Sequence, residues 1–551
     1  MTNKELADLI FPNVSTDISV FEEKYPERNL PDGAVVSRFA PSPTGFVHMG
    51  SLLSAFIESF VPKTTGGIFY LRIEDTDGKR TVDNGISGII KDLKDFDIKI
   101  DEGMVSETES IGNYGPYIQS ARKEIYETYA KKLLSEGLAY PCFCTEDDLS
   151  SMREQQEHKK NRIGYYGHWA KCRNLTNEEC AEKIKNGEKY VIRLKSPGNF
   201  EHKVTLNDLV RGKIEMPEND MDVVLIKGDG LPIYHFAHVI DDHLMRTTHV
   251  LRGEEWISSY PIHTQLFKIL KFKEPKYGHL GLIMKIDETG ARRKLSKRKD
   301  PEAAVSFYHE KGIPIEAVKL YLLTIANSNF EAWLDANPNA SIYDFKFDFK
   351  KMSDSGSLFD VEKLLNISKN YISKLKAEEV YDNLFNYTEE YDKELNNLIK
   401  KYKEYTIDVL NIEREQKKPR KDFASYSDIK NHIWYMYDEL FDSKDYEFQK
   451  ITDKMEIKKL LETYIEKYYD ESDDKENWFN KIKLLCDEFN YASNMKEYKE
   501  NPTKFKGNVA DVSTVLRVAL TTKSMTPDLY EIMKLLGKDR IIKRYNIFNV
   551  E

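Results

Sequence analysis

Residues 34–60 read AVVSRFAPSPTGFVHMGSLLSAFIESF, and they decide the fold because their hydrophobic period changes midway. Residues 34–40 form an apolar run of strand length, which two prolines and a glycine in residues 41–45 interrupt. After this turn the apolar residues recur with helical spacing, as Leu52, Leu53, Phe56, Ile57 and Phe60 do. The stretch therefore predicts a buried strand, a turn and a helix.

The same alternation continues on both sides of a long interruption. Residues 68–73 read as a second strand and residues 83–96 as a second helix, which makes a βαβ unit and hence a parallel sheet. Later in the chain the pattern returns, with strands at residues 223–226 and 248–251 and helices at residues 234–243 and 256–270. The two parts are expected to form one sheet.

The interruption, residues 117–217, is mixed and polar and carries four of the five cysteines, which indicates an inserted α+β subdomain. Beyond residue 301 strand signals fade and long helical periodicity dominates. The prediction is an α/β protein: a Rossmann-like parallel-sheet domain split by the insertion, followed by all-α domains. Its expected segments are a polar extension (1–33), the split sheet domain (34–116 and 218–300), the insertion (117–217) and two helical domains (301–375 and 376–551).

Composition argues against a membrane protein and a secreted protein. No run of about eighteen apolar residues occurs in the 551, and residues 1–20 lack the basic start and apolar stretch of a signal peptide. Five cysteines, an odd number, do not suit a disulfide framework, so a cytoplasmic protein without a membrane partner is expected. The net charge of -10 repels nucleic acid globally but does not exclude a local basic face.

The first cluster of interest lies where the turn meets the first helix. Unpaired backbone N–H groups and the helix dipole favour an anion there, and Gly50 lets a phosphate approach the backbone. His48 can donate to charge that develops on a phosphoryl oxygen. The alternative is an ordinary helix start, with a glycine for packing and a satisfied histidine.

A second cluster is the cation-rich segment 294–298 (KLSKR), which follows the apolar run 280–284 and reads as a loop after a strand. Lys294 and Lys297 can meet negative charge that appears on phosphates only in a transition state. The alternatives are a solvated basic surface loop or an RNA contact.

A third cluster suits a small zwitterionic ligand. Glu74, in the segment 72–77 (RIEDTD) at the end of a strand, is well placed for an amino group, since ligands of such sheets bind beyond the carboxyl ends of strands. Arg38 and Arg252 are candidates to bind carboxylates in a planar bidentate manner. The alternatives are a carboxylate pair that caps a turn, and an ion pair of Arg252 with Glu254 or Glu255.

Five ordered motifs resemble one family, the glutamyl subgroup of class I aminoacyl-tRNA synthetases in its bacterial form. Residues 38–50 resemble the first class signature, with Ser51 where the general signature has a second histidine, and residues 294–298 resemble K-M-S-K-S. The other motifs are residues 72–77, 231–238 (LPIYHFAH) and 247–256 (TTHVLRGEEW). The resemblance implies ATP-dependent activation of L-glutamate and its transfer to tRNA(Glu), with Mg²⁺ on the phosphates.

The resemblance also implies roles for single residues. ATP is expected to bind at His48, Gly50, Ser51, Lys294 and Lys297, of which His48, Lys294 and Lys297 are catalytic. Glutamate is expected to bind at Arg38, Ala40, Ser42, Glu74, Tyr234, His238 and Arg252, although a helical tyrosine such as Tyr234 often only packs. The alternatives are a glutaminyl-tRNA synthetase and a catalytically silent RNA-binding paralogue.

The insertion offers a candidate metal site. Cys142, Cys144 and Cys172 supply three thiols, and the resemblance implies zinc in some bacterial members, with a fourth ligand four residues before the last cysteine, which is His168 here. Reduced cysteines without metal are the alternative, because C-x-C is shorter than the usual spacing of structural zinc sites.

The helical half carries fewer motifs. Residues 357–364 and 516–521 resemble the stem-contact and terminal anticodon-binding regions of the family, so residues 301–375 and 376–551 are expected to contact tRNA. A monomer is expected. Whether tRNA(Gln) is also charged depends on anticodon contacts that no motif reveals.

Overall fold

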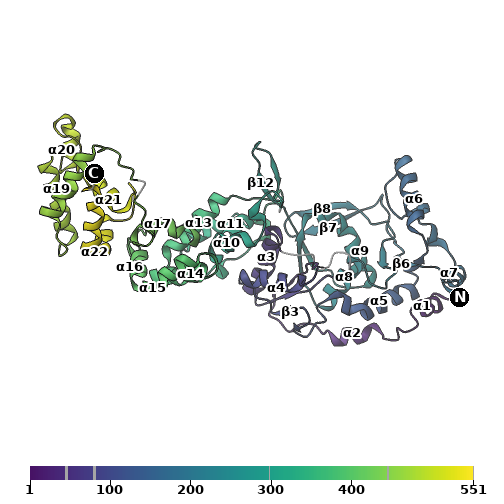
Figure 1. Ribbon diagram of the computed structural model, residues 1–551. Coiled ribbons are helices and arrows are strands. Elements are labelled where there is room, and N and C mark those ends of the chain that lie inside the picture. Colours follow the sequence, from purple (N-terminus) through teal and green to yellow (C-terminus); the bar gives the residue numbers. More distant parts are fainter. Residues whose placement is uncertain (44–46, 78–81, 297, 444–445, 550–551) are drawn as a thin grey trace. The chain divides into compact units, whose positions relative to one another are not determined.

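The computed structural model describes residues 1–43, 47–77, 82–296, 298–443 and 446–549 (Figure 1). It divides into two compact units. The first contains residues 1–307 and 319–360, and the second contains residues 308–318 and 361–551.

The first unit is built on parallel strands from two separate parts of the chain. β1 (Val36–Phe39) pairs with β2 (Ile68–Leu71), which pairs with β3 (Glu102–Met104), and β10 (His249–Gly253) pairs with β11 (Lys276–Leu280). β10 lies beside β1, since the Thr248 N–H donates to the Val36 carbonyl at 2.9 Å. The predicted split parallel sheet is therefore confirmed, with β4 (Ser110–Ile111) added antiparallel beside β3.

Four helices accompany these strands: α3 (Met49–Thr65), α4 (Gly85–Asp95), α8 (Tyr234–Leu244) and α9 (Tyr260–Leu270). α3 follows the proline turn and buries Leu52, Phe56 and Phe60 against the sheet, as the sequence period predicts. It ends at Gly66, whose φ of 68° is left-handed, a conformation that glycine adopts without steric cost.

The insertion has its own mixed architecture, which Figure 1 shows beside α8 and α9. Its elements are α5 (Lys123–Ser135), β5 (Ala139–Cys142), α6 (Glu146–His158), α7 (Asn177–Lys185), β6 (Val191–Leu194), β7 (Lys203–Asp208) and β8 (Gly212–Pro217). The β7–β8 hairpin joins the main sheet where β7 pairs with β11, through Asp208 and Tyr277.

One predicted strand, at residues 223–226, lies in a different sheet from the one expected. We expected residues 223–226 to resume the parallel sheet, but β9 (Val224–Ile226) pairs antiparallel with β6 and completes the sheet β5-β6-β9 of the insertion. An apolar run predicts that a strand is buried, and it does not specify the partner strand.

The N-terminal segment is more ordered than a polar extension. It forms α1 (Asn3–Ile10) and α2 (Ile18–Lys24), and α1 packs on α5 and α7. Arg28 then binds Glu102 with two hydrogen bonds of 2.8 and 2.9 Å and donates to the Met245 carbonyl. The segment therefore links the insertion to both parts of the sheet domain.

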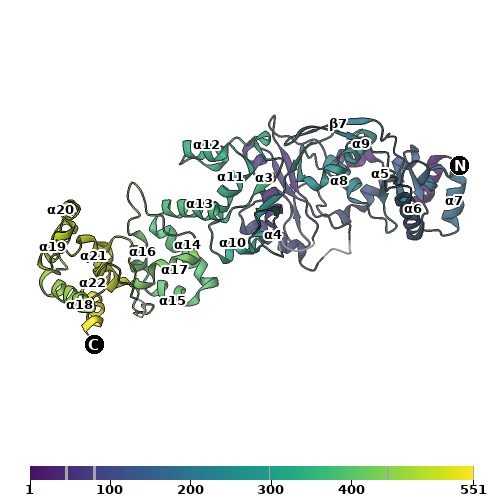
Figure 2. The same ribbon diagram turned by 90° about the horizontal axis from the view of Figure 1, so that it is seen from above.

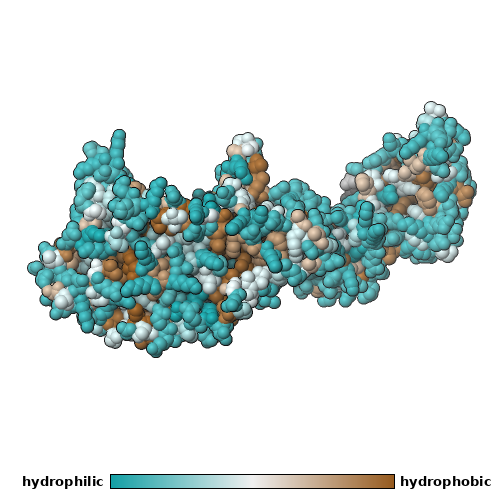
Figure 3. Space-filling model, turned by 180° about the vertical axis from the view of Figure 1, so that it is seen from behind, coloured by the Kyte–Doolittle hydropathy of each residue, from teal (hydrophilic) through white to brown (hydrophobic). Residues whose placement is uncertain are grey.

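A hairpin and three helices complete the region around residue 301. β12 (Ile283–Ile286) pairs antiparallel with β13 (Arg292–Lys294) and parallel with β14 (Ser357–Leu358). In Figure 3 hydrophilic residues cover most of the visible face, whereas hydrophobic residues are visible on this projecting hairpin, where Ile286 is half exposed. The helices are α10 (Ser306–Glu310), α11 (Ile315–Ala326) and α12 (Phe330–Ala336).

The second unit is helical, as predicted, and one hydrophobic core extends from Ile372 to Tyr545. Its helices are α13 (Val361–Lys374), α14 (Ala377–Tyr391), α15 (Lys393–Lys401), α16 (Lys403–Asn411), α17 (Tyr426–Ile433), α18 (Lys454–Thr463), α19 (Lys475–Glu488), α20 (Met495–Glu500), α21 (Val509–Thr521) and α22 (Leu529–Asn546). Figure 2 shows α18 to α22 gathered together. Across the described parts of both units, no helix is long and apolar enough to cross a membrane.

Candidate active site

A cavity of about 870 Å³ lies at the carboxyl ends of the parallel strands. Residues from both parts of the sheet domain line it. Those among them that the sequence singled out are Arg38, Ala40, Ser42, His48, Gly50, Ser51, Glu74, Tyr234, Arg252 and Lys294. Lys297 lies outside the described residues.

One wall is the start of α3. His48 is its N-cap, and the Ser51 backbone N–H donates to His48 Nδ1 at 3.2 Å, while Ser51 Oγ lies 3.0 Å from Nε2. A Cβ atom at Gly50 would meet the His48 ring at 3.0 Å, so a larger residue would displace that ring. His48, Gly50 and Ser51 line the cavity at the N-terminus of α3, where the helix dipole favours a phosphate.

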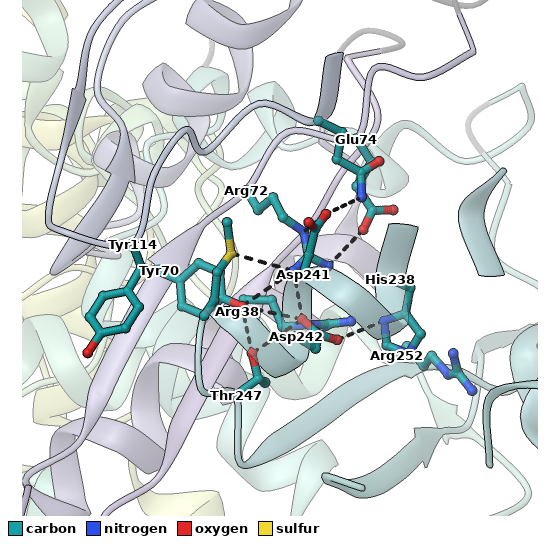
Figure 4. Close-up of polar contacts among 12 residues, drawn as sticks. Arg38, Tyr70, Arg72, Glu74, Tyr114, His238, Asp241, Asp242, Thr247 and Arg252 are labelled. Atoms are coloured by element: carbon teal, nitrogen blue, oxygen red, sulfur yellow. Dashed lines mark hydrogen bonds and ion pairs between the residues drawn. The ribbon is translucent and has the colours of Figure 1, made fainter. Parts of the chain in front are cut away.

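Behind the cavity, two arginines and a histidine converge on Asp242 of α8 (Figure 4). Arg38 Nε lies 3.1 and 3.2 Å from the two carboxylate oxygens, Arg72 Nη1 lies 2.6 Å away, and His238 Nδ1 lies 2.7 Å away. Burial opposes the charge of Asp242, but Arg38 and Arg72 nevertheless hold its pKa well below the ordinary value. Asp242 is therefore a buried anion shared by two cations.

This anion orients the groups that face a ligand. Arg72 Nη2 donates to Glu74 Oε1 at 3.0 Å, so Asp242 acts on Glu74 through Arg72 and on Arg38 directly. The neighbouring Asp241 binds Arg122, at 2.7 Å, and Tyr126 of α5, at 2.8 Å, which attaches α8 to the insertion. Neither aspartate was predicted from the sequence, although an acidic pair inside an otherwise apolar helix is an unusual signal.

Replacing Asp242 with asparagine is expected to lower the free energy of unfolding by about 3–5 kcal/mol, because two buried guanidinium groups lose their shared counter-ion. Denaturant unfolding measures the change. Asp229→Asn is the matched control: Asp229 pairs with Lys227 on the surface, and such a pair contributes at most about 1 kcal/mol. Equal effects of the two substitutions would contradict the role of Asp242.

Arg252, which also lines the cavity, is surrounded by histidines rather than carboxylates. Its Nε donates to His279 Nε2 at 2.9 Å, and Nη1 lies 3.0 Å from His263 Nδ1 and 3.3 Å from the Tyr234 hydroxyl. The predicted alternative, an ion pair with Glu254 or Glu255, is wrong: Glu254 binds Arg211 instead, and Glu255 forms no ion pair with Arg252 within the described residues. Nη2 of Arg252 is buried and has no hydrogen-bond partner in the described part of the chain.

The histidines around Arg252 stay neutral. Burial, together with the positive charge of Arg252, lowers the pKa of His235 to about 4 and that of His263 well below its ordinary value. A neutral imidazole accepts a hydrogen bond without neutralising the guanidinium, so Arg252 keeps its positive charge for a ligand carboxylate.

The position of His238 differs from the one expected of a glutamate-binding residue. It is fully buried behind Tyr234, whose ring stacks on it with centroids 5.4 Å apart, and it is not among the described residues that line the cavity. It contacts Asp242 and the Tyr277 hydroxyl instead. Helical spacing placed Tyr234 and His238 on one face, but the larger tyrosine covers the histidine.

Asp300 binds residues on either side of Lys294 in the cation-rich segment. Arg293 binds Asp300 with hydrogen bonds of 2.6 and 2.7 Å, and the Ser296 N–H donates to the same carboxylate. The Arg293 bonds hold the pKa of Asp300 well below its ordinary value. Lys294, at the end of β13, therefore stands at the cavity on an anchored segment.

In the insertion, the Sγ atoms of Cys142, Cys144 and Cys172 lie within 4.8 Å of one another. The Tyr165 hydroxyl lies 3.4 and 3.3 Å from the first two thiols. His168 is not the fourth member: it is exposed and packs on Trp169, because the short helical turn after Tyr166 directs it outward. Hydrogen bonds from Cys144 and Cys172 lower the pKa of Cys142, and the same cluster of contacts raises the pKa of Cys144, so these two thiols do not ionise together.

Comparison with known proteins agrees with this geometry. The catalytic-domain model of class I tRNA synthetases (E and Q) matches residues 34–366, and an anticodon binding domain model matches residues 417–548. The chain is 49% identical to a glutamate–tRNA ligase of Clostridium perfringens over the whole of both chains. It is 42% identical to one of Sorangium cellulosum, over 95% of this chain and 96% of that protein.

A solved structure extends the likeness to three dimensions. The crystal structure of a glutamate tRNA ligase from Elizabethkingia meningosepticum in complex with its amino acid superimposes with a TM-score of 0.75 at 26% identity. The match covers 93% of this chain and 99% of that one. Sequence and fold lead to the same conclusion: the chain belongs to the glutamate–tRNA ligases, within the class I aminoacyl-tRNA synthetases.

Proposed function

We propose that this chain joins L-glutamate to the terminal ribose of tRNA(Glu) in two steps. The glutamate α-carboxylate attacks the α-phosphorus of ATP, the bond to the β-phosphate breaks, and pyrophosphate leaves. A ribose hydroxyl of the tRNA then attacks the carbonyl carbon of glutamyl-adenylate, and AMP leaves. One observation carries the proposal: Arg252, with its buried and unpartnered Nη2, shares the wall of one cavity with Arg38 and Glu74.

The charges of that cavity match those of glutamate. Two carboxylates need two cationic partners, for which Arg38 and Arg252 are available, and the ammonium group needs an anion, for which Glu74 is available. Ala40, Ser42 and Tyr234 complete this wall. A charged Arg252 suits a side-chain carboxylate better than an amide, which argues against a glutaminyl-tRNA synthetase.

ATP, as its magnesium complex, would bind at the opposite end of the cavity. The first turn of α3, with His48, Gly50 and Ser51, would hold phosphate oxygens, and Lys294 would approach the charge that develops as pyrophosphate leaves. Lys297 is assigned the same task by its position in the KLSKR motif alone. The presence of His48 and Lys294 at the cavity argues against a silent paralogue.

ATP-dependent attachment of radiolabelled glutamate to separate tRNA(Glu) and tRNA(Gln) transcripts tests the proposal. Charging of tRNA(Glu) alone indicates a discriminating enzyme, and charging of both indicates one that relies on a later amidation. Attachment of glutamine in place of glutamate would favour the glutaminyl alternative, and charging of neither transcript would favour a silent paralogue.

We further propose a structural zinc ion in the insertion, bound by Cys142, Cys144, Cys172 and the Tyr165 oxygen. The three Sγ atoms lie within 4.8 Å of one another, and the phenol oxygen lies 3.4 and 3.3 Å from those of Cys142 and Cys144. This set of ligands suits the four-coordinate geometry of structural zinc. The ion would fix the fold of this segment and would take no part in the reaction.

Cys172→Ser is expected to reduce the zinc content of the purified protein from about one ion per chain to near zero, as a structural site with a lost thiolate loses most of its affinity. Elemental analysis measures it. Cys180→Ser is the control, because Cys180 is a buried cysteine outside the thiol cluster. Wild-type protein without zinc would refute the site.

A cytoplasmic monomer completes the proposal. All five cysteines are free, in keeping with a reducing compartment.

A further inference from the structure

One acidic residue in the cavity has no part in the roles above. Glu58 lies on α3, lines the cavity, and its side chain is only 2% exposed. Its Oε1 lies 3.8 Å from Arg38 Nη1, and its Oε2 has no hydrogen-bond partner among the residues that the structure describes. A buried, unpartnered carboxyl oxygen costs free energy unless a ligand or a proton satisfies it.

The surroundings of Arg38 make an ionised Glu58 unfavourable once substrate is bound. Asp242 already occupies the Nε side of Arg38, so the Nη side remains for a ligand carboxylate. An ionised Glu58 would then be the third carboxylate around one guanidinium, and like charges at this separation repel strongly in a buried site. In its acid form, Glu58 would instead offer a donor, and a carboxylate would accept it.

We propose that Glu58 is a further substrate-binding residue, which recognises glutamate in its protonated form: its Oε2–H donates to the glutamate carboxylate that Arg38 pairs with. The inference rests on the proposed function, since it assumes glutamate in this cavity. It makes glutamate binding depend on a proton that the enzyme, and not the substrate, carries.

The electrostatics of the site support this assignment. Burial raises the pKa of Glu58 to about 8, although Arg38 and the Ser54 hydroxyl, one turn earlier on α3, act in the opposite direction. The charged groups that face Glu58 are Arg38 of β1 and Asp242 of α8. Neither titrates near neutral pH, because the pKa of Arg38 is raised and that of Asp242 is held far below its ordinary value.

The consequence is a KM that depends on pH. If only the acid form binds glutamate, the KM rises as the pH passes the pKa of Glu58, by about tenfold between pH 7 and pH 9. Glu58→Gln keeps the size and a donor but cannot ionise, so its KM should vary less than about twofold over the same range.

The experiment measures the KM for glutamate in charging of tRNA(Glu) at several pH values from 7 to 9, for wild type, Glu58→Gln and Glu274→Gln. Glu274 is the matched control: burial raises its pKa too, but it binds Thr264 and lies outside the described lining of the cavity. The Glu274→Gln protein should keep the wild-type pH dependence. The ionisation of glutamate itself is common to all three proteins and cancels in the comparison.

A second variant guards against misfolding of Glu58→Gln. Ser54→Ala removes the neighbouring hydroxyl that lowers the pKa of Glu58, so its KM should begin to rise at a higher pH than in wild type. A wild-type KM that is constant with pH, or an equal pH dependence in wild type and Glu58→Gln, would overturn the inference. Loss of glutamate charging in every protein at every pH would instead refute the proposed function.

Discussion

The KM for glutamate is expected to rise by about 10²–10³-fold when Arg252 is replaced with alanine, equivalent to about 3–4 kcal/mol for a lost buried charge-assisted pair. The reason is the unusual environment of this guanidinium. Neutral His263 and His279 accept its N–H groups without cancelling its charge, so the positive charge is left for the substrate. Charging kinetics with varied glutamate measure the effect.

Two comparisons make this result specific. Arg252→Lys keeps a positive charge but loses the planar fork, so it should recover only part of the affinity for glutamate. The KM for ATP should change little in either variant, because the proposed phosphate site is the first turn of α3, whereas Arg252 bonds to Tyr234, His263 and His279. An unchanged glutamate KM in Arg252→Ala would remove this residue from the substrate site.

The parts of the fold that the sequence predicted are those that depend on local period. Hydrophobic spacing within short segments predicts β1 and α3, and it also predicts the later order α8, β10, α9. The partner of β9 and the packing of α1 on α5 and α7 could not be predicted, because they depend on contacts between residues distant in sequence.

In the candidate site, too, some residues could be predicted from the sequence and others could not. Motifs identified the residues that face the cavity, such as Arg38, Glu74 and Arg252. They did not reveal Glu58 or Asp242, which act on those residues from behind or beside them. Nor did they find Tyr165, since the spacing rule pointed to His168 and only the folded loop shows which ring meets the thiols. Acidic residues inside apolar helices were the available signal, a single one for Glu58 and an adjacent pair for Asp242.

The second large effect is expected at His48. His48→Ala should lower the kcat of ATP–pyrophosphate exchange, measured with tRNA bound, by about 10²–10³-fold, the range found when one preorganised donor to a developing oxyanion is removed. The glutamate KM should change little, because His48 is proposed to contact the phosphates of ATP and not glutamate. A fall in kcat without a matching rise in KM is the mark of an interaction made only in the transition state.

His48 also caps α3, so the catalytic effect must be separated from a loss of stability. Its Nδ1 accepts the Ser51 N–H, and removal of such a cap costs about 1 kcal/mol. His48→Asn is the matched control, because asparagine caps a helix well but is too short to reach where the imidazole reaches. Recovery of thermal stability without recovery of kcat in His48→Asn would support a catalytic role. Recovery of both would show that His48 acts only as a cap, because any well-capped α3 would then hold ATP equally well.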